Sequence, residues 1–235
     1  MMNAMPQPRY HATPHEAITE TVREDVFIDD YTFRIDRPAE TDKLLDHPWV
    51  RSAYAADEYV PYWATLWPSA RMLAKAVVRE PWDTYRPGTH VLEVGCGLGL
   101  AGVAALARNI PVTFSDVDET AVEYAAANAR LNGFTDFRTR PIDFRAPPSD
   151  IQYPVVIGSD LMYEERLVNP LIDLLRAVMA ADGVCLIADP DRTPARHFKW
   201  RLMEAGYDVA AELIRAGEPG GERTKGTLYR IRNAV

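Results

Sequence analysis

The chain has 235 residues, of which 47% are hydrophobic and 26% charged, so one sizeable core and a single α/β domain with an extension fit its length. Its 34 acidic residues outnumber its 26 Lys and Arg residues, and the net charge of −8 disfavours a broad basic surface for nucleic acid. Two cysteines are too few for a disulfide framework or a cysteine-rich zinc site, and the five histidines show no metal-ligand spacing, so no metal is expected.

The N-terminal sequence lacks the pattern of a secretory signal, which is a basic segment followed by an apolar stretch. No part of the chain approaches the roughly 20 apolar residues that a membrane-spanning helix needs. We therefore predict a soluble, cytoplasmic protein with no membrane partner. Residues 1–20 are polar and contain several prolines, and we expect them to fray from the fold.

Two elements are predicted before the first glycine-rich segment. In residues 26–35, hydrophobic and polar residues alternate on both sides of an Asp-Asp pair, which is typical of a two-stranded hairpin. Further on, hydrophobic residues recur at helical spacing, and Pro68 suits the first turn of a helix that begins near Trp67. We assign residues 1–60 to an N-terminal extension with this hairpin and residues 61–235 to the main domain.

From residue 89 onward, strand-like hydrophobic runs alternate with helical patterns. Such alternation predicts βαβ units and a parallel sheet that helices cover on both faces. Strands are expected at residues 90–94, 112–116, 137–142, 154–160 and 184–189, with helices at 101–109, 120–132, 167–179 and 195–205. Two more strands, at 207–216 and 226–234, flank a Gly-rich segment and predict an antiparallel pair at the sheet edge. The expected fold is α/β, a Rossmann-like doubly wound sheet of seven strands, mostly parallel, with an antiparallel C-terminal strand.

The segment VLEVGCGLGLAG follows the first predicted strand of the sheet and contains two overlapping patterns. From Gly97 onward its spacing is the G-x-G-x-x-G of a dinucleotide-binding turn, whereas from Glu93 it is acid-x-G-x-G-x-G with Gly95, Gly97 and Gly99. A carboxylate at the strand end opposes the pyrophosphate of a dinucleotide at the helix N-terminus. S-adenosylmethionine has no phosphate and carries an ammonium and a sulfonium group, so Glu93 favours S-adenosylmethionine over NAD.

Acidic residues also follow the next two predicted strands. Asp116 ends the second strand, where its carboxylate would accept both ribose hydroxyls, a geometry that NAD sites share. Asp143 follows the third strand and is predicted to accept an adenine amino proton, with Phe144 available to stack. The alternative for Asp143 is an ordinary acid of a surface loop.

Together, LEVGCGLG and Asp116 resemble the first motifs of the class I, seven-stranded S-adenosylmethionine-dependent methyltransferases. Within that superfamily, YWATLWPSARMLAKAV and the later GSDLMYEE resemble the family 16 protein lysine methyltransferases, which carry a Trp-bearing helix before the glycine motif and D-x-x-Y after the fourth strand. LIADPDR is similar to a segment of the electron-transfer-flavoprotein β-subunit lysine methyltransferases. The resemblance implies S-adenosyl-L-methionine as cofactor, S-adenosyl-L-homocysteine as product and a protein substrate.

The resemblance also implies roles for three residues. Asp160 and Tyr163 occupy the D-x-x-Y positions, so Asp160 would hydrogen-bond the incoming amine, and Tyr163 would line the acceptor channel or position Asp160. Trp67 would border the cofactor pocket. The alternatives are a helix cap for Asp160, a packed aromatic for Tyr163 and core packing for Trp67.

These observations predict an S-adenosylmethionine-dependent N-methyltransferase that modifies lysine side chains of a protein. An acidic Asp160 suits a basic amine better than an amide, for which related enzymes carry an Asn-Pro-Pro-Tyr-like motif. A small-molecule amine methyltransferase and a non-catalytic S-adenosylmethionine-binding protein are the alternatives, and an oxidoreductase is the least favoured. The sequence identifies neither the acceptor nor the oligomeric state.

Overall fold

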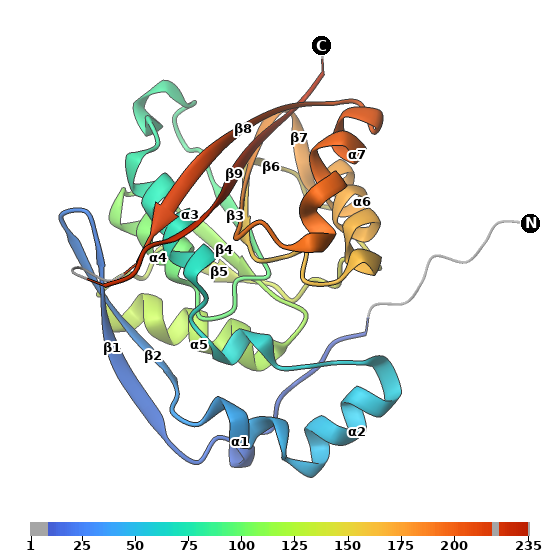
Figure 1. The fold of residues 1–235 in the computed structure, drawn as a ribbon. Coiled ribbons are helices and arrows are strands. Elements are labelled where there is room, and N and C mark those ends of the chain that lie inside the picture. The colour runs from blue at the N-terminus through green and yellow to red at the C-terminus, as the bar shows by residue number, and fades with distance from the viewer. Residues whose placement is uncertain (1–8, 218–220, 235) are drawn as a thin grey trace, which may run out of the picture.

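The computed structural model describes residues 9–217 and 221–234. A seven-stranded sheet runs through the molecule with helices on both sides (Figure 1). Its strands are β3 (Val91–Val94), β4 (Val112–Ser115), β5 (Phe137–Thr139), β6 (Tyr153–Ser159), β7 (Met179–Asp189), β8 (Tyr207–Ala216) and β9 (Thr224–Asn233). Their order is β5-β4-β3-β6-β7-β9-β8, and β9 runs in the direction opposite to the other six strands. The predicted fold, including the antiparallel C-terminal strand, is confirmed.

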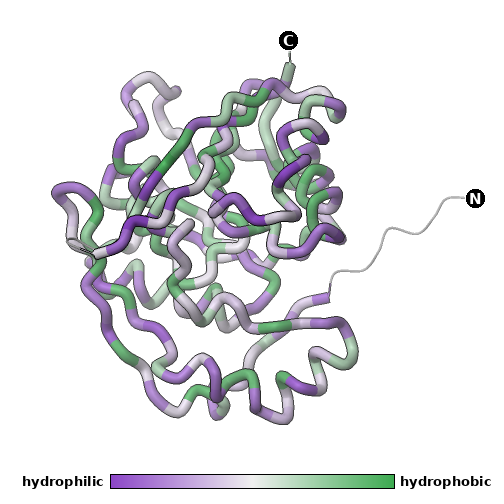
Figure 2. The backbone as a smooth tube through the Cα atoms, viewed as in Figure 1, coloured by the Kyte–Doolittle hydropathy of each residue, from purple (hydrophilic) through white to green (hydrophobic). Residues whose placement is uncertain are grey.

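The helices cover the sheet in two groups because successive strand residues point to opposite faces. Val155 and Ile157 of β6 belong to one hydrophobic cluster, and Val156 between them belongs to the other. Helices α3 (Pro68–Arg79), α4 (Leu100–Ala107) and α5 (Glu119–Leu131) contribute to the first cluster, whereas α6 (Val168–Val178) and α7 (Phe198–Glu204) contribute to the second. Figure 2 shows hydrophobic residues along the central strands and hydrophilic residues on the outer loops.

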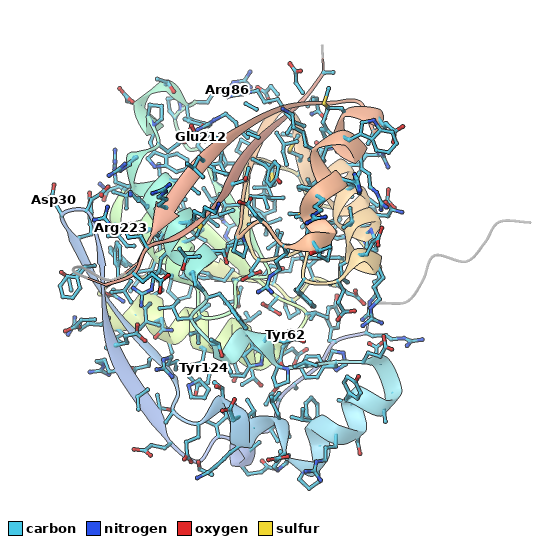
Figure 3. All side chains as sticks on the ribbon, viewed as in Figure 1. Asp30, Tyr62, Arg86, Tyr124, Glu212 and Arg223 are labelled. Atoms are coloured by element: carbon cyan, nitrogen blue, oxygen red, sulfur yellow. The ribbon has the colours of Figure 1, made fainter. Side chains whose placement is uncertain are left out.

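The N-terminal hairpin is present as predicted. Strands β1 (Thr21–Ile28) and β2 (Tyr31–Pro38) pair in antiparallel register around Asp29 and Asp30, and Asp30 lies at the tip of the hairpin (Figure 3). Its inward-facing residues, Val26 among them, join the same hydrophobic cluster as α4 and α5. The hairpin therefore shares its core with the main sheet.

Other helices connect the hairpin to the sheet or cap its loops. Helix α3 begins at Pro68 with Trp67 as its N-cap, as the sequence predicted, whereas the two helices before it were not predicted. These are α1 (Thr41–Leu45) and α2 (Pro48–Asp57), and the short 3₁₀ helices are η1 (His15–Ala17), η2 (Tyr62–Ala64), η3 (Trp82–Thr84), η4 (Glu165–Leu167) and η5 (Thr193–His197). Among the described residues, no helix is both long and apolar enough to cross a membrane.

The expectation that residues 1–20 fray is wrong for residues 9–20, and residues 1–8 lie outside the described residues. The backbone of His11 bridges the end of β4: its N–H donates to the Val117 carbonyl over 3.0 Å, and its carbonyl accepts from the Glu119 N–H over 2.8 Å. Thr13 is 1% exposed. These backbone hydrogen bonds and this burial hold the segment against the sheet, where it passes between α2 and the rest of the molecule (Figure 1).

Candidate active site

A cavity of about 510 Å³ opens at the carboxyl ends of the parallel strands, where open α/β sheets bind their ligands. Its volume lies in the range typical of small-molecule sites. The residues that line it come from both the glycine-rich turn and the segments after β4 and β6. Among them are Gly95, Gly97, Gly99, Asp116, Asp143, Phe144, Asp160, Tyr163, Tyr62, Trp67 and Arg192.

The glycine-rich turn between β3 and α4 forms one wall of the cavity. Gly95, Gly97 and Gly99 have φ angles of 58°, 51° and 79°, in the left-handed region that glycine adopts without strain. Because these residues have no side chains, the cavity reaches the peptide backbone itself. The turn therefore provides the backbone approach that the sequence predicted for a cofactor.

Asp116 lies directly after β4, lines the cavity and is 8% exposed. Its Oδ2 accepts from the Gly97 N–H over 3.0 Å and its Oδ1 from the Asp118 N–H over 3.1 Å. Burial raises the pKa of Asp116 to about 6, while these backbone donors act in the opposite direction. A carboxylate held in this way, with lone pairs left over, fits the predicted role of hydroxyl acceptor.

Glu93 does not line the cavity, although the sequence predicted that it would face the methyl donor. Its side chain is buried against α4, where Oε2 accepts from the Gly102 N–H over 2.9 Å. This donor is one of the backbone groups that the first turn of a helix leaves without a partner. Burial and the nearby charge of Asp116 raise the pKa of Glu93 to about 8. The structure thus gives Glu93 a contact with the helix that follows the turn, because a buried carboxyl group needs a donor.

Asp143 and Phe144 follow β5 in the chain, and both line the cavity. The Asp143 carboxylate is 3% exposed and already has partners: Arg145 Nε donates to Oδ1 over 2.9 Å, and the Arg9 N–H donates to Oδ2 over 2.9 Å. Arg145 also pairs with Asp57 of α2 over 2.8 Å. Asp143 is therefore part of an ion-pair network, not the free loop acid that was the alternative.

Asp160 follows β6 at the other end of the cavity and has a φ of 58°. Ser69 Oγ donates to its Oδ2 over 2.9 Å, and Arg192 Nε donates to its Oδ1 over 2.5 Å. The alternative interpretation of Asp160 as a helix cap is wrong, because its carboxylate is taken by these two side chains and the next helix, η4, has Glu164 as its N-cap.

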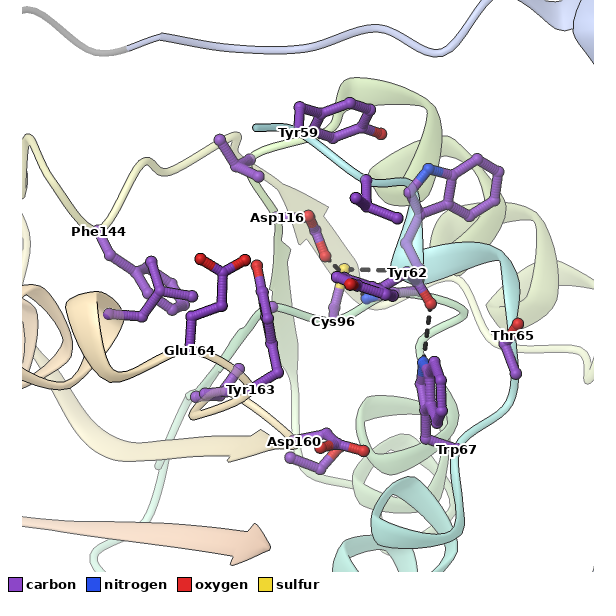
Figure 4. A pocket seen from close by; sticks show the side chains of 18 of the residues that line it. Tyr59, Tyr62, Thr65, Trp67, Cys96, Asp116, Phe144, Asp160, Tyr163 and Glu164 are labelled. Carbon is purple, nitrogen blue, oxygen red and sulfur yellow. Dashed lines mark hydrogen bonds between the residues drawn. The ribbon is translucent and has the colours of Figure 1, made fainter. Parts of the chain in front are cut away.

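Three aromatic side chains stand around Asp160. Tyr163 packs edge-on against Tyr62, with ring centroids 5.0 Å apart, and Tyr62 packs edge-on against Trp67 at 6.2 Å. The Trp67 Nε1–H donates to the Tyr62 carbonyl over 2.8 Å. Figure 4 shows Tyr62 and Tyr163 between Asp116 at one end and Asp160 with Trp67 at the other. Trp67 thus lines the cavity on the Asp160 side.

Two further residues make contacts at the site. Asp118 caps α5 by accepting from the Thr120 N–H over 2.8 Å, and it also accepts from Thr13 Oγ1 over 2.6 Å and Trp63 Nε1 over 3.0 Å. Arg192 lines the cavity and contacts Asp160. No local pattern announces these contacts, because their partners lie more than 30 positions away in the chain.

A family model described as lysine methyltransferase matches residues 62–202, which contain the glycine turn, Asp116, Asp160 and Tyr163. The chain belongs to this lysine methyltransferase family. S-adenosylmethionine is accordingly its cofactor. The cavity has the features that such a group needs, because it reaches the backbone of the glycine turn and is lined by the Asp116 carboxylate.

Relatives in this family align with only part of their length. The chain is 32% identical over 138 residues to an electron transfer flavoprotein beta subunit lysine methyltransferase of Xenopus laevis, which covers 56% of this chain and 53% of that protein. It is 27% identical over 180 residues to a protein-lysine N-methyltransferase of Schizosaccharomyces pombe, covering 70% and 58%. The chain thus spans about half the length of the curated relatives it matches.

Solved structures share the fold at lower identity. A ribosomal protein L11 methylase from Lactobacillus delbrueckii superposes with a TM-score of 0.54 and 21% identity over 69% of this chain and 78% of that one. A tRNA (uracil-54, C5)-methyltransferase of Pyrococcus abyssi, in complex with S-adenosyl-L-homocysteine, has a TM-score of 0.56 and 18% identity over 91% and 44%. At these identities the likeness shows the fold alone.

Proposed function

We propose that this protein is an S-adenosylmethionine-dependent N-methyltransferase that methylates lysine side chains of a protein substrate. The observation that carries the proposal is the single cavity that joins a side-chain-free glycine turn and Asp116 at one end to Asp160 and an aromatic group at the other. Gly95, Gly97, Gly99 and Asp116 would hold the cofactor. Protein-lysine methyltransferases among the relatives support a protein acceptor.

The cofactor, when bound, supplies an electrophilic methyl group on a sulfonium. The chain must present a neutral amine in line with it, and lysine in water has a pKa of about 10.4, which leaves little neutral amine near pH 7. The acceptor would enter as an ammonium, and after it loses a proton to solvent the aromatic walls formed by Tyr62, Trp67 and Tyr163 would limit the access of water to the neutral amine. Asp160, fixed by Ser69, would accept a hydrogen bond from the amine and orient its lone pair.

Asp143, Phe144 and Trp67 have less direct proposed roles. Phe144 would stack on the adenine. Arg145 and Arg9 donate two hydrogen bonds to each Asp143 oxygen, so Asp143 would accept from the adenine amino group only if one of these donors gave way. Trp67 would border both cofactor and acceptor. Glu93 would act indirectly, by fixing the helix that follows the turn.

For the organisation of the chain, we propose that residues 61–235 carry the methyltransferase activity and that residues 1–60 complete the cavity wall. Asp57, Glu58, Tyr59 and His11 line the cavity, which supports a contribution from the extension. We also propose a reducing, cytoplasmic environment, which the two buried free thiols suit.

The test is methylation of lysate proteins by the purified enzyme with isotopically labelled cofactor, followed by mass spectrometry. We expect label on lysine side chains with the wild type, and a loss of at least a hundredfold with Asp160→Asn. Asp191→Asn is the matched control: Asp191 has a similar φ of 60° but does not line the cavity, so its labelling should equal wild type.

Other outcomes would favour the alternatives. Label only in the small-molecule fraction would indicate a small-molecule amine methyltransferase, and tight cofactor binding without label anywhere would indicate a binding protein. Stabilisation by NAD and not by S-adenosylhomocysteine in thermal unfolding would contradict the proposal as a whole.

A further inference from the structure

Arg192 contacts the two groups that an acceptor ammonium would use. Its Nε donates to Asp160 Oδ1 over 2.5 Å, and its Cζ lies 5.4 Å from the centre of the Trp67 ring. A carboxylate and an aromatic face are the two side-chain groups that attract an organic cation most strongly. In the structure, the Arg192 guanidinium contacts both groups.

We propose that Arg192 is a specificity-determining positioning residue whose guanidinium occupies the place of the acceptor's ammonium until an acceptor displaces it. This inference rests on the proposed lysine methyltransferase function and deepens it. Arg192 is the occupant of the acceptor site in the resting protein, and the Asp160 carboxyl group stays oriented between turnovers because it always has a cation as its partner.

The surroundings of Arg192 suit a side chain that is held at its backbone and released at its tip. Its backbone N–H donates to Asp189 Oδ1 over 2.8 Å, while its side chain is 33% exposed at the cavity edge. Asp160, by contrast, is only 8% exposed and is fixed by Ser69. The guanidinium is therefore the partner that can swing toward solvent, and the carboxylate is the partner that stays.

This exchange explains how the site would select a basic acceptor. In the part of the chain that the structure describes, Arg192 is the cation paired with Asp160. A nearly buried carboxylate that loses its cation is strongly destabilised, so a neutral side chain cannot displace Arg192 without leaving that charge unpaired. An incoming ammonium replaces one cation by another and keeps the carboxylate paired. The acceptor class that follows is a primary ammonium, as on lysine, in preference to an amide or a hydroxyl group.

The inference is tested by cation binding, which needs no methyl transfer. The probe is n-butylammonium chloride, titrated at pH 8 into the full-length protein saturated with S-adenosylhomocysteine, with indole resonances and calorimetry as readouts. We expect Arg192→Ala to bind n-butylammonium at least tenfold more tightly than wild type. Arg192→Lys, which keeps a cation at this position, should return the affinity to the wild-type level.

Two controls separate a vacated cation site from a simple cavity. n-Butanol, which has the same chain without the charge, should gain no affinity in Arg192→Ala, and Asp160→Asn in the same background should abolish the gain for n-butylammonium. Arg176→Ala, which removes an exposed arginine of α6 outside the cavity, should behave as wild type.

Equal n-butylammonium affinity in wild type and Arg192→Ala would overturn the inference, as would an equal gain for n-butanol. Unchanged S-adenosylhomocysteine affinity establishes that each variant is folded. If Arg192→Ala fails this check, Arg192→Gln replaces it, and the same gain in n-butylammonium affinity is expected. The two proposals fail separately: lysate labelling without a change in n-butylammonium affinity refutes only the role of Arg192, and the reverse result refutes only the lysine methyltransferase assignment.

Discussion

The buried carboxyl group of Glu93, whose donors are backbone groups of α4, makes the stability of the fold depend on pH. Its pKa in the folded protein is about 8, against a usual value near 4.5. Where folding raises the pKa of a group, its contribution to the free energy of unfolding is complete below the pKa of the unfolded state. That contribution is lost as the pH rises through the pKa of the folded state. The relevant window is therefore pH 4.5 to 8.

We predict that Glu93→Gln becomes progressively more stable than wild type across that window. Glutamine still accepts from the Gly102 N–H but never ionises, so the free-energy advantage should grow by about 1.4 kcal/mol per pH unit at most. Urea unfolding of both proteins at pH 5, 6, 7 and 8 measures it, and Asp150→Asn, an exposed acid paired with Arg140, is the control. A difference that does not change with pH would show that Glu93 is not protonated in the folded protein.

Asp116 makes the corresponding prediction for cofactor binding. We expect Asp116→Asn to weaken S-adenosylhomocysteine binding by roughly ten- to a hundredfold, because hydrogen bonds to a charged acceptor contribute about 1.5–3 kcal/mol. The Asn side chain still accepts one backbone N–H, so the turn should persist. Calorimetric titration at pH 8, well above the pKa of about 6, gives the affinity, and an unchanged dissociation constant would remove Asp116 from the cofactor site.

For single residues, the sequence predicts a position that follows from the topology of the sheet. It does not predict a position that follows from side-chain packing. Asp116 was predictable because a residue that ends a parallel strand must lie at the ligand-binding edge. The orientation of the Glu93 side chain was not predictable, because a carboxylate at the end of β3 can accept a hydrogen bond either from a ligand or from the Gly102 N–H. The partnership of Arg192 with Asp160 was equally invisible, since 32 positions separate them.

Among the elements, the glycine turn is held by close contact with α5. Gly99 has a φ of 79°, and a Cβ there would lie 2.7 Å from Ala125 Cβ and 2.9 Å from Ala125 Cα. The backbone of α5 cannot rotate away as a flexible side chain would. The third glycine of the turn is therefore required both by its conformation and by the space available.

We predict that Gly99→Ala lowers the free energy of unfolding by about 2–4 kcal/mol, from left-handed strain and overpacking together. The matched control is Gly133→Ala, because Gly133 has a φ of 84° but nothing within 4 Å of an added Cβ. In that variant the free energy of unfolding should fall only by the cost of a left-handed backbone conformation for alanine, about 1 kcal/mol. Denaturant unfolding of the two variants isolates the contact with α5, and equal losses would show that the contact costs nothing.

The elements that the sequence missed are those with few buried residues. Helix α2 buries only Val50, so it lacks the hydrophobic periodicity that predicts a helix. Its start was nevertheless marked, because Pro48 suits a first helical position and His47 accepts from the Trp49 N–H. The central strands β3, β4 and β6, by contrast, are buried on both faces and read as continuous hydrophobic runs.

At the scale of the whole molecule, residues 9–13 join parts of the chain that are distant in sequence. Thr13 Oγ1 donates to the buried Asp118, and His11 stacks on Tyr59 with ring centroids 4.0 Å apart. His11 and Tyr59 both line the cavity, and the Arg9 N–H reaches Asp143. The segment thus forms part of the wall on the side of Asp116 and Asp143, and cofactor held there would be covered by it.

We predict that deleting residues 1–13 accelerates S-adenosylhomocysteine dissociation at least tenfold. The deletion removes the His11 wall and the hydrogen bonds to Asp118 and Asp143, which opens that end of the cavity to water. Stopped-flow dissociation measures the rate, and deletion of residues 1–8 alone, which leaves those contacts in place, should dissociate at the wild-type rate. If both deletions dissociate at the wild-type rate, residues 9–13 do not retain the ligand; if both accelerate equally, retention depends on residues 1–8.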